Sequence, residues 1–242
     1  MYDFLNFTMV DAVNCGREIR HLGSNARSME DAANELVQFF YENFIEKESE
    51  TKSCVLVRFF KMHDYNHLGD DLKIIARKSI NDACFPENFM CLTLLATRGT
   101  NPEWNSRHAS VGHQAIPLMD TESVDKIPMI KNLIKQMGLE VGSVLEIDSK
   151  LMTDLSQKTF NVFHVPDASD GYSIPAQENF IKPYGVKSVL GFGGVLPSGH
   201  LFSMIIFSRT FISPEVANRF ITVTLNMKMV VMPFAKRVFS SN

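Results

Sequence analysis

The sequence predicts an α+β domain in which helices at both chain ends pack on a central, largely antiparallel sheet. Three observations favour this class. Short apolar runs of strand length are bounded by Gly, Pro, Asn or charged residues. Two of these runs, 186–196 and 201–208, are joined by the turn Pro197-Ser-Gly-His200, which is typical of an antiparallel hairpin. Amphipathic stretches at 28–46 and 214–232 have helical spacing.

The composition is that of an ordinary globular protein. Of the 242 residues, 45% are hydrophobic and 21% are charged, and the formal net charge is −3. A sizeable core can therefore form, and nothing supplies the positive field that a nucleic-acid partner would need. The N-terminus lacks a secretory signal, and no apolar run is long enough to span a bilayer. We expect a cytoplasmic chain with an N-terminal segment at 1–27 and one domain at 28–242.

The first helix is expected to begin after Ser28, because a serine cap and the early acid Asp31 satisfy the exposed amide groups of a helix N-terminus. Leu36, Phe40 and Phe44 then follow at the spacing of one helical face. The apolar runs at 54–60 and 89–97 predict two buried strands. Between them, the run 72–76 predicts only one or two helical turns.

The middle of the chain predicts one well-bounded helix and one strand. Pro128 in a first turn and Gly138 beyond the last turn mark the two ends of the helix. Residues 159–165 alternate in the way that a strand does. Ser213 and Pro214 then open the last helix, which Pro233 should end or kink.

The segment 182–208 and the cap that follows it resemble the closing half of a GAF sensory domain. In that family a strand turns through a Gly and returns as an apolar strand that ends in Phe-Ser, and a Ser-Pro-Glu-like cap then opens the last helix; Ser188 to Glu215 follows this pattern. The opening, an acidic amphipathic helix followed by the strand at 54–60, is also similar. The resemblance covers about 28–232 and leaves about 98–158 as a long insertion.

The GAF resemblance implies a small ligand held between the sheet and the overlying loops, with a signal passed through the terminal helices to an output domain such as a sensor histidine kinase or a cyclase of a two-component or similar pathway. It places the candidate ligand-binding residues in and around that roof: Trp104, His113, His164, Tyr172 and Phe192. No cofactor can be named. The glycines at 191–194 are expected to mark a bulge or a close backbone approach and not a phosphate loop.

The histidine and cysteine pattern predicts no catalytic or metal site. His108 and His113 lie five apart without a supporting ligand, and His63 and His67 are interpreted as surface polarity in a loop. The four cysteines have no paired spacing, and Cys54 and Cys91 are expected to be small buried hydrophobes. Ser198-Gly-His200 lacks the strand–turn–helix setting of a hydrolase nucleophile, so no enzyme activity is expected.

Two other function classes stay open. With 19 Phe and 13 Met, the chain could fill its own pocket and act as a ligand-free dimerisation or protein-interaction module. The second alternative is a thiol-dependent redox enzyme. If the chain is a GAF-like sensor, we also expect a homodimer formed by the first and last of the predicted helices. In that dimer Phe220 and Met227 would pack on their symmetry mates.

Overall fold

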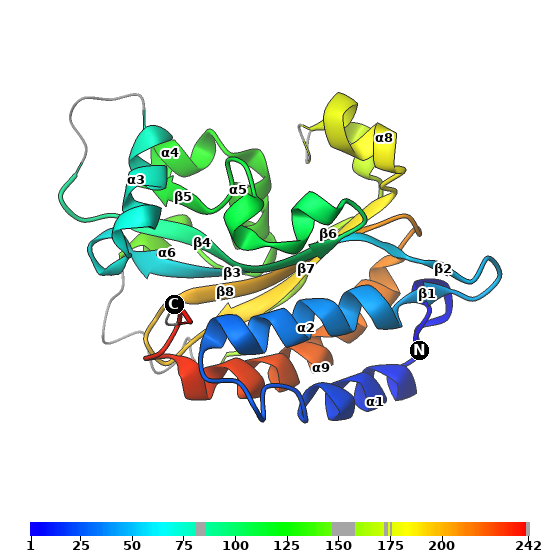
Figure 1. Ribbon diagram of the computed structural model, residues 1–242. Helices are drawn as coiled ribbons and strands as arrows, with labels where there is room; N and C mark the ends of the chain where they lie inside the picture. Colours follow the sequence, from blue (N-terminus) through cyan, green and yellow to red (C-terminus); the bar gives the residue numbers. More distant parts are fainter. Residues whose placement is uncertain (81–85, 147–157, 172–173, 175, 241–242) are drawn as a thin grey trace.

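A six-stranded antiparallel sheet forms the centre of the computed structural model, which describes residues 1–80, 86–146, 158–171, 174 and 176–240 (Figure 1). The strand order is β5-β4-β3-β8-β7-β6. The bounds are β3 Cys54–Asp64, β4 Met90–Gly99, β5 Ala115–Leu118, β6 Phe163–Val165, β7 Ser188–Val195 and β8 Leu201–Ser208. A separate two-stranded ribbon joins β1 (Ile45–Glu46) to β2 (Thr51–Lys52). The predicted α+β class with an antiparallel sheet is confirmed.

Two helices, α2 (Met29–Asn43) and α9 (Pro214–Val231), pack on one face of the sheet, which we call the helix-covered face (Figure 1). A third helix, α1 (Met9–Ile19), packs against α9. A capping box between Ser28 and Asp31 begins α2, and the Ser213 side chain accepts from the Val216 amide to begin α9. Pro233 lies in a short 3-10 turn that follows α9, as predicted.

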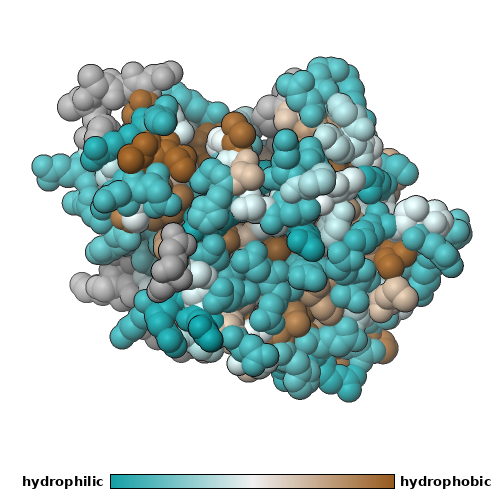
Figure 2. All heavy atoms as spheres, in the orientation of Figure 1, coloured by the Kyte–Doolittle hydropathy of each residue, from teal (hydrophilic) through white to brown (hydrophobic). Residues whose placement is uncertain are grey.

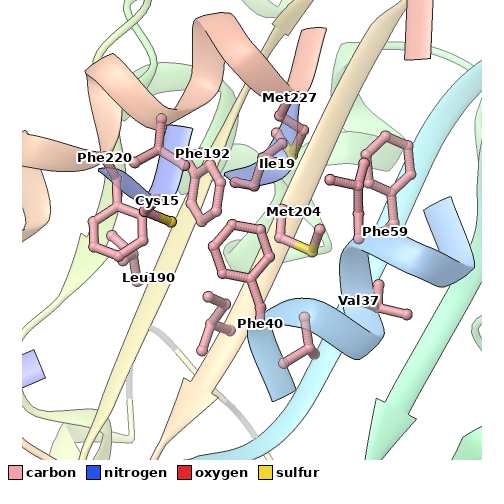
Figure 3. Packing of buried hydrophobic residues seen from close by; sticks show 14 of the residues in the cluster. Cys15, Ile19, Val37, Phe40, Phe59, Leu190, Phe192, Met204, Phe220 and Met227 are labelled. Atoms are coloured by element: carbon pink, nitrogen blue, oxygen red, sulfur yellow. The ribbon is translucent and has the colours of Figure 1, made fainter. Parts of the chain in front are cut away.

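Packed aromatic rings form the core on this face. Phe40 from α2, Phe192 from β7 and Phe220 from α9 are fully buried, and the Phe192 ring contacts the rings of the other two (Figure 3). The segment 1–27 contributes to the same core, because Phe4 stacks on Phe44 with ring centroids 4.5 Å apart and Phe7 stacks on Phe220 at 4.9 Å. The N-terminal residues therefore pack with the residues that follow them.

The opposite face, the loop-covered face, carries shorter elements (Figure 1). These are α4 (Thr121–Asp125), α5 (Pro128–Gln136), α6 (Val141–Leu145), the π-helical turn η6 (Gln177–Ile181) and α8 (Lys182–Tyr184). The helix α3 (Asp70–Lys78) packs beside the edge strand β5. The long segment after residue 98 thus supplies both β5 and much of the cover of this face.

Most predicted elements are confirmed. The hairpin pairs Val195 with Leu201 and turns at 197–200, as expected. The glycine run of β7 is a close backbone approach, because a Cβ on Gly193 would lie 2.0 Å from the Phe202 carbonyl oxygen.

Three expectations need correction. The strand predicted at 54–60 continues to Asp64, because its far end pairs with both β4 and β8. The strand predicted at 159–165 contains only 163–165, the part that pairs with β7. Finally, Phe220 and Met227 are fully buried within their own chain, so neither is free to contact a symmetry mate.

Candidate functional site

An arginine lies in the middle of β3, one of the two central strands of the sheet. Arg58 lies on the loop-covered face of β3, since its neighbours at i−2 and i+2, Leu56 and Phe60, both belong to the core on that side. Its guanidinium contacts the Ser110 hydroxyl at 3.4 Å. Burial in these apolar surroundings lowers the pKa of Arg58 to about 10. A cation in this position is costly, so its surroundings must supply or admit a partner.

Two hydroxyl groups on the same face are also buried without a hydrogen-bond partner among the described residues. Thr97 lies directly opposite Arg58 on β4, and Ser203 lies opposite Phe60 on β8. Among the described residues, Arg58 Nε, Thr97 Oγ1 and Ser203 Oγ are all buried without a hydrogen-bond partner. A buried polar atom without a partner costs stability, so three of them on adjacent strands suggest that a group from outside can complete them.

The surface over this face is notched. In the space-filling view a hollow separates the part of the molecule that contains α4 and α5 from the part that contains η6 and α8, on the same side of the sheet as Arg58 (Figure 2). Trp104 lies half-buried on this side, with its ring 4.6 Å from Tyr184 and 5.4 Å from Phe180. Aromatic side chains therefore flank the region that the polar groups face.

The structure brings together only part of the predicted ligand-binding set. Trp104 lies on the loop-covered side, and His113 lies near Arg58 in the loop before β5; partial desolvation and then the Arg58 charge lower the pKa of His113. His164 and Phe192 lie on the helix-covered face: His164 Nε2 contacts the Ile212 carbonyl oxygen at 2.9 Å, and Phe192 is in the aromatic core. Side chains on opposite faces of one sheet cannot contact the same small ligand. Tyr172 lies outside the described residues.

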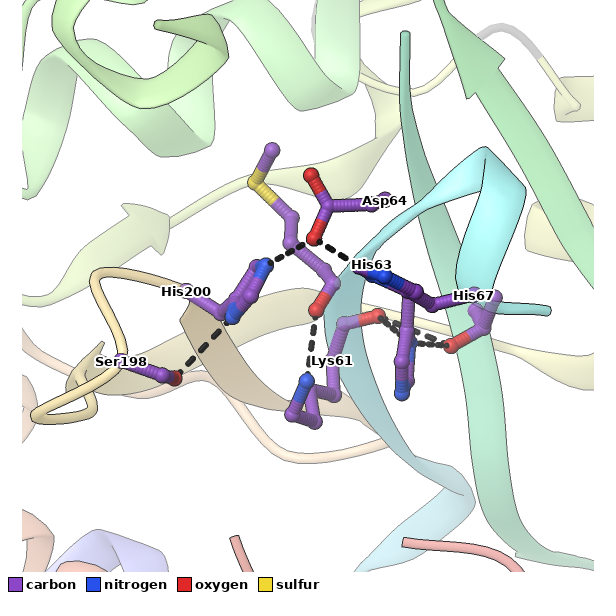
Figure 4. Close-up of polar contacts among 8 residues, drawn as sticks. Lys61, His63, Asp64, His67, Ser198 and His200 are labelled. Atoms are coloured by element: carbon purple, nitrogen blue, oxygen red, sulfur yellow. Dashed lines mark hydrogen bonds and ion pairs between the residues drawn. The ribbon is translucent and has the colours of Figure 1, made fainter. Parts of the chain in front are cut away.

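A second polar cluster lies where β3 ends and β8 begins (Figure 4). His200 Nε2 contacts Asp64 Oδ2 at 3.1 Å, His67 Nδ1 contacts the same oxygen at 3.3 Å, and Ser198 Oγ lies 3.0 Å from His200 Nδ1. Burial alone would raise the pKa of Asp64, but the hydrogen bond from His67 and the charge of His200 leave it lowered. The carboxylate therefore holds two imidazoles in place.

Lys61 and His63 extend this cluster into the interior on the helix-covered side. Both are more than nine-tenths buried, and Lys61 Nζ donates to the Met62 carbonyl oxygen at 2.8 Å. The interpretation of His63 as surface polarity is wrong, because the side chain is buried in β3 and the ring of Phe239 stacks on it. His67 is exposed, as expected.

Cysteine and metal chemistry have little support in the described residues. Burial raises the pKa of Cys15, Cys54 and Cys91, the last to about 12, and all three side chains are buried and free. Cys54 and Cys91 thus behave as the small hydrophobes that the sequence predicts. His, Cys, Asp and Glu side chains do not gather in groups of three that could hold a metal within the described ranges. Cys84 lies outside them.

The fold can be compared with solved structures. The GAF domain of an Acinetobacter phosphoenolpyruvate-protein phosphotransferase matches with 13% sequence identity and a TM-score of 0.45, over 95% of this chain and 97% of that chain. The chain is similar to GAF domains. A second GAF domain, from the phosphoenolpyruvate-protein phosphotransferase of Coxiella burnetii, matches with 12% identity and a TM-score of 0.42, over 93% and 94%. No family model and no curated protein matches the sequence.

The GAF-like resemblance stated from the sequence is therefore also found among solved structures, and at these values it carries no information on ligand or activity. Within the described residues, no helix is both long enough and apolar enough to cross a membrane. Sequence reasoning missed Arg58, Thr97 and Ser203. The available signal was a charged residue at an inward position between Leu56 and Phe60 in an otherwise apolar strand.

Proposed function

We propose that the chain is a GAF-like regulatory domain that binds a small ligand on the loop-covered face of its sheet and passes a signal through its terminal helices. The observation that carries the proposal is the buried Arg58 guanidinium, whose Nε has no partner among the described residues beside the equally unpartnered Thr97 hydroxyl. A ligand with a carboxylate, phosphate or carbonyl oxygen would complete both groups. Such charge-assisted bonds are among the strongest in proteins.

The experiment is a ligand search with a matched pair of variants. Native mass spectrometry of the purified chain looks for a bound small molecule, and a thermal-shift screen of small carboxylates and phosphates looks for ligands that raise Tm. For any hit, Arg58→Met should weaken binding about 10- to 100-fold, since hydrogen bonds to charged groups contribute about 1.5–3 kcal/mol. Arg98→Met is the control, because Arg98 pairs with Val57 and so lies on the opposite face.

The outcomes separate the hypotheses. A ligand whose affinity falls in Arg58→Met and not in Arg98→Met supports the proposed site. A ligand that binds both variants equally would place the site elsewhere. If no hit appears and Arg58→Met only raises Tm, the ligand-free interaction module becomes the better account, because removal of an uncompensated buried charge stabilises a protein that does not use it.

Signal output requires a partner, and the proposed partner is a second copy of this chain. Leu225 and Met229 on α9 and Met232 directly after it are 52%, 56% and 43% exposed and recur at i, i+4 and i+7, so they form one apolar stripe. On α1, Met9, Val10 and Val13 are also exposed. In a two-fold dimer this patch would meet itself and bring the two α9 helices together. An output domain, such as a kinase or cyclase, would then be paired.

The redox alternative is the least supported. A catalytic thiol needs an exposed, electropositive setting that favours the thiolate. Cys15, Cys54 and Cys91 instead have raised pKa values in buried positions.

A further inference from the structure

The last described residues of the chain return to the N-terminal end of α2 (Figure 1). We call residues 237–240 the C-terminal strap. The Arg237 and Val238 carbonyl oxygens each accept a hydrogen bond of 2.8 Å, from the amides of Met29 and Glu30 respectively. These amides belong to the first turn of α2, where no carbonyl of the helix itself can accept them. The strap therefore acts as a cap for α2.

Side chains fix the strap at both sides. The Ser240 hydroxyl donates to Asp31 Oδ1 at 2.7 Å, and its amide donates to Glu30 Oε2 at 3.1 Å. The ring of Phe239 lies between two cationic or ionisable groups. It stacks on the His63 imidazole with centroids 5.2 Å apart, and the Arg107 guanidinium lies 5.2 Å from its centroid.

The hydrogen bonds of His63 determine which ring nitrogen is open to protonation. His63 Nδ1 lies 3.3 Å from the Lys61 carbonyl oxygen, which can only accept, and 2.6 Å from the Thr93 hydroxyl, which itself lies 2.9 Å from the same carbonyl. A proton on Nδ1 satisfies this arrangement. His63 Nε2 is then the unprotonated nitrogen. It is buried and has no partner among the described residues. A proton taken up there would create a buried N–H and a buried charge that nothing accepts.

The neighbouring groups add to that cost. Lys61 and His200 face the ring with positive or potentially positive charge, while Asp64 is occupied by His67 and His200. Burial first, then the Lys61 and His200 charges, lower the pKa of His63 to about 2. The groups that face His63 and the strap, element by element, are Lys61 and Asp64 (β3), His67 (the turn after β3), Cys91 (β4), His200 (before β8), Arg107 (the loop before β5), and Glu30 and Asp31 (α2).

We propose that the strap is a releasable cover whose docking on α2 competes with proton uptake at His63 Nε2, so that acidification releases it. Release removes the Phe239 ring, admits water to the imidazole and uncaps α2. Because only a short 3-10 turn and two further residues separate the strap from α9, its release frees the chain that follows α9 and the start of α2. The device does not depend on the proposed ligand site.

The size of the effect follows from linkage. A histidine that is neutral when the strap is docked and titrates near 6.5 when released favours the released state as the pH falls below 6.5. At pH 6.5 half of the released imidazole is already protonated, so docking at pH 5 should be about 16-fold weaker than at pH 6.5.

Hydrogen exchange tests this at single amides. The Met29 and Glu30 amides, which donate to the strap, should lose about 16-fold of their protection between pH 6.5 and pH 5 after correction for intrinsic exchange. The amide of Phe40, in the interior of α2, should keep its protection at both pH values. His63→Phe keeps a ring under Phe239 and cannot take up a proton, so protection in this variant should be independent of pH. Phe239→Ala should leave both amides unprotected at either pH, while Phe211→Ala, at an exposed phenylalanine, should behave as wild type.

Three results would overturn the proposal. The first is equal protection of both amides at pH 6.5 and pH 5 in the wild type. The second is a pH dependence that persists in His63→Phe. The third is a pH dependence that disappears in His200→Gln or His67→Gln while His63 is intact, since another histidine would then carry the switch. If His63→Phe does not fold, the wild-type profile together with Phe239→Ala and the two glutamine variants still decides the question.

Discussion

Arg107 and Glu30 form an ion pair that is buried on both sides. Arg107 Nε lies 2.6 Å from Glu30 Oε1, and the two side chains are only 9% and 10% exposed. Arg107 comes from the loop before β5 and Glu30 from the first turn of α2, which are 77 residues apart in the chain. This pair therefore ties the edge of the sheet to the helix-covered face.

We expect Glu30→Gln to lower the free energy of unfolding by about 3 kcal/mol, because it leaves the Arg107 charge buried and unpaired. Adding Arg107→Met to that variant should recover part of the loss, since the uncompensated charge is then gone. Urea unfolding measures both. Glu122→Gln, in the exposed pair with Lys126, is the control and should cause no measurable change. Equal effects of the two single substitutions would show that burial of the pair does not matter.

Lys61 is expected to lower the free energy of unfolding. Burial lowers the pKa of its ammonium from the ordinary 10.5 to about 8, which corresponds to about 3 kcal/mol of destabilisation of the charged form. After about 1 kcal/mol for the lost hydrogen bond to the Met62 carbonyl, Lys61→Met should stabilise the protein by about 2 kcal/mol at pH 7. Lys78→Met, at an exposed position on α3, is the matched control.

The same group predicts a pH dependence. Between pH 8 and pH 10.5 the unfolded chain binds a proton at Lys61 that the folded chain does not, so wild-type stability should rise with pH across this window. The advantage of Lys61→Met should shrink to near zero by pH 10.5. An advantage that stays constant from pH 7 to pH 10.5 would argue against a desolvated ammonium.

Gly193 should not tolerate a side chain. A Cβ there would lie 2.0 Å from the Phe202 carbonyl oxygen and 2.7 Å from the Ser203 Cα, and both are backbone atoms that cannot rotate away. Gly193→Ala should destabilise the protein by about 3 kcal/mol, near the upper end of overpacking costs. Gly142→Ala, in α6 with open space around the new methyl group, should be neutral or stabilising by up to about 1 kcal/mol.

The α9 stripe predicts where a dimer would be broken. Leu225→Glu and Met229→Glu should each convert a dimer to a monomer in light scattering at tens of micromolar, because a charge would be placed in a self-facing apolar patch. Ile74→Glu is the control, since Ile74 is equally exposed at 54% on α3, away from α9. A wild-type chain that is already monomeric at that concentration, with the same mass in all three variants, would exclude this interface.

Thiol reactivity tests the redox alternative. In a Cys84→Ser chain the remaining three cysteines are buried with raised pKa values, so no thiol should react rapidly with an alkylating reagent at pH 8. Unfolding in urea should expose all three. A fast-reacting thiol in the folded Cys84→Ser protein would reopen the redox hypothesis.

Local chemistry in the sequence determined the elements and most of their ends. The cap at Ser28, the proline at 214 and the glycine turn at 197–200 act within a few residues, so helix α2, helix α9 and the β7–β8 hairpin were predicted with correct types. Apolar runs likewise located β3 and β4, because a buried strand needs little beyond its own residues to be recognised.

The sites depended on pairing across distant strands and were decided by the tertiary structure alone. Strand length at Lys61 and His63 followed from partners in β4 and β8, and the burial of His63 followed from a segment about 176 residues further on, Phe239. The division of the predicted ligand set followed from the same cause. Trp104 and Phe192 each had a plausible position in the sequence, but which face of the sheet each side chain occupies depends on strand register, and register depends on contacts that local sequence does not contain.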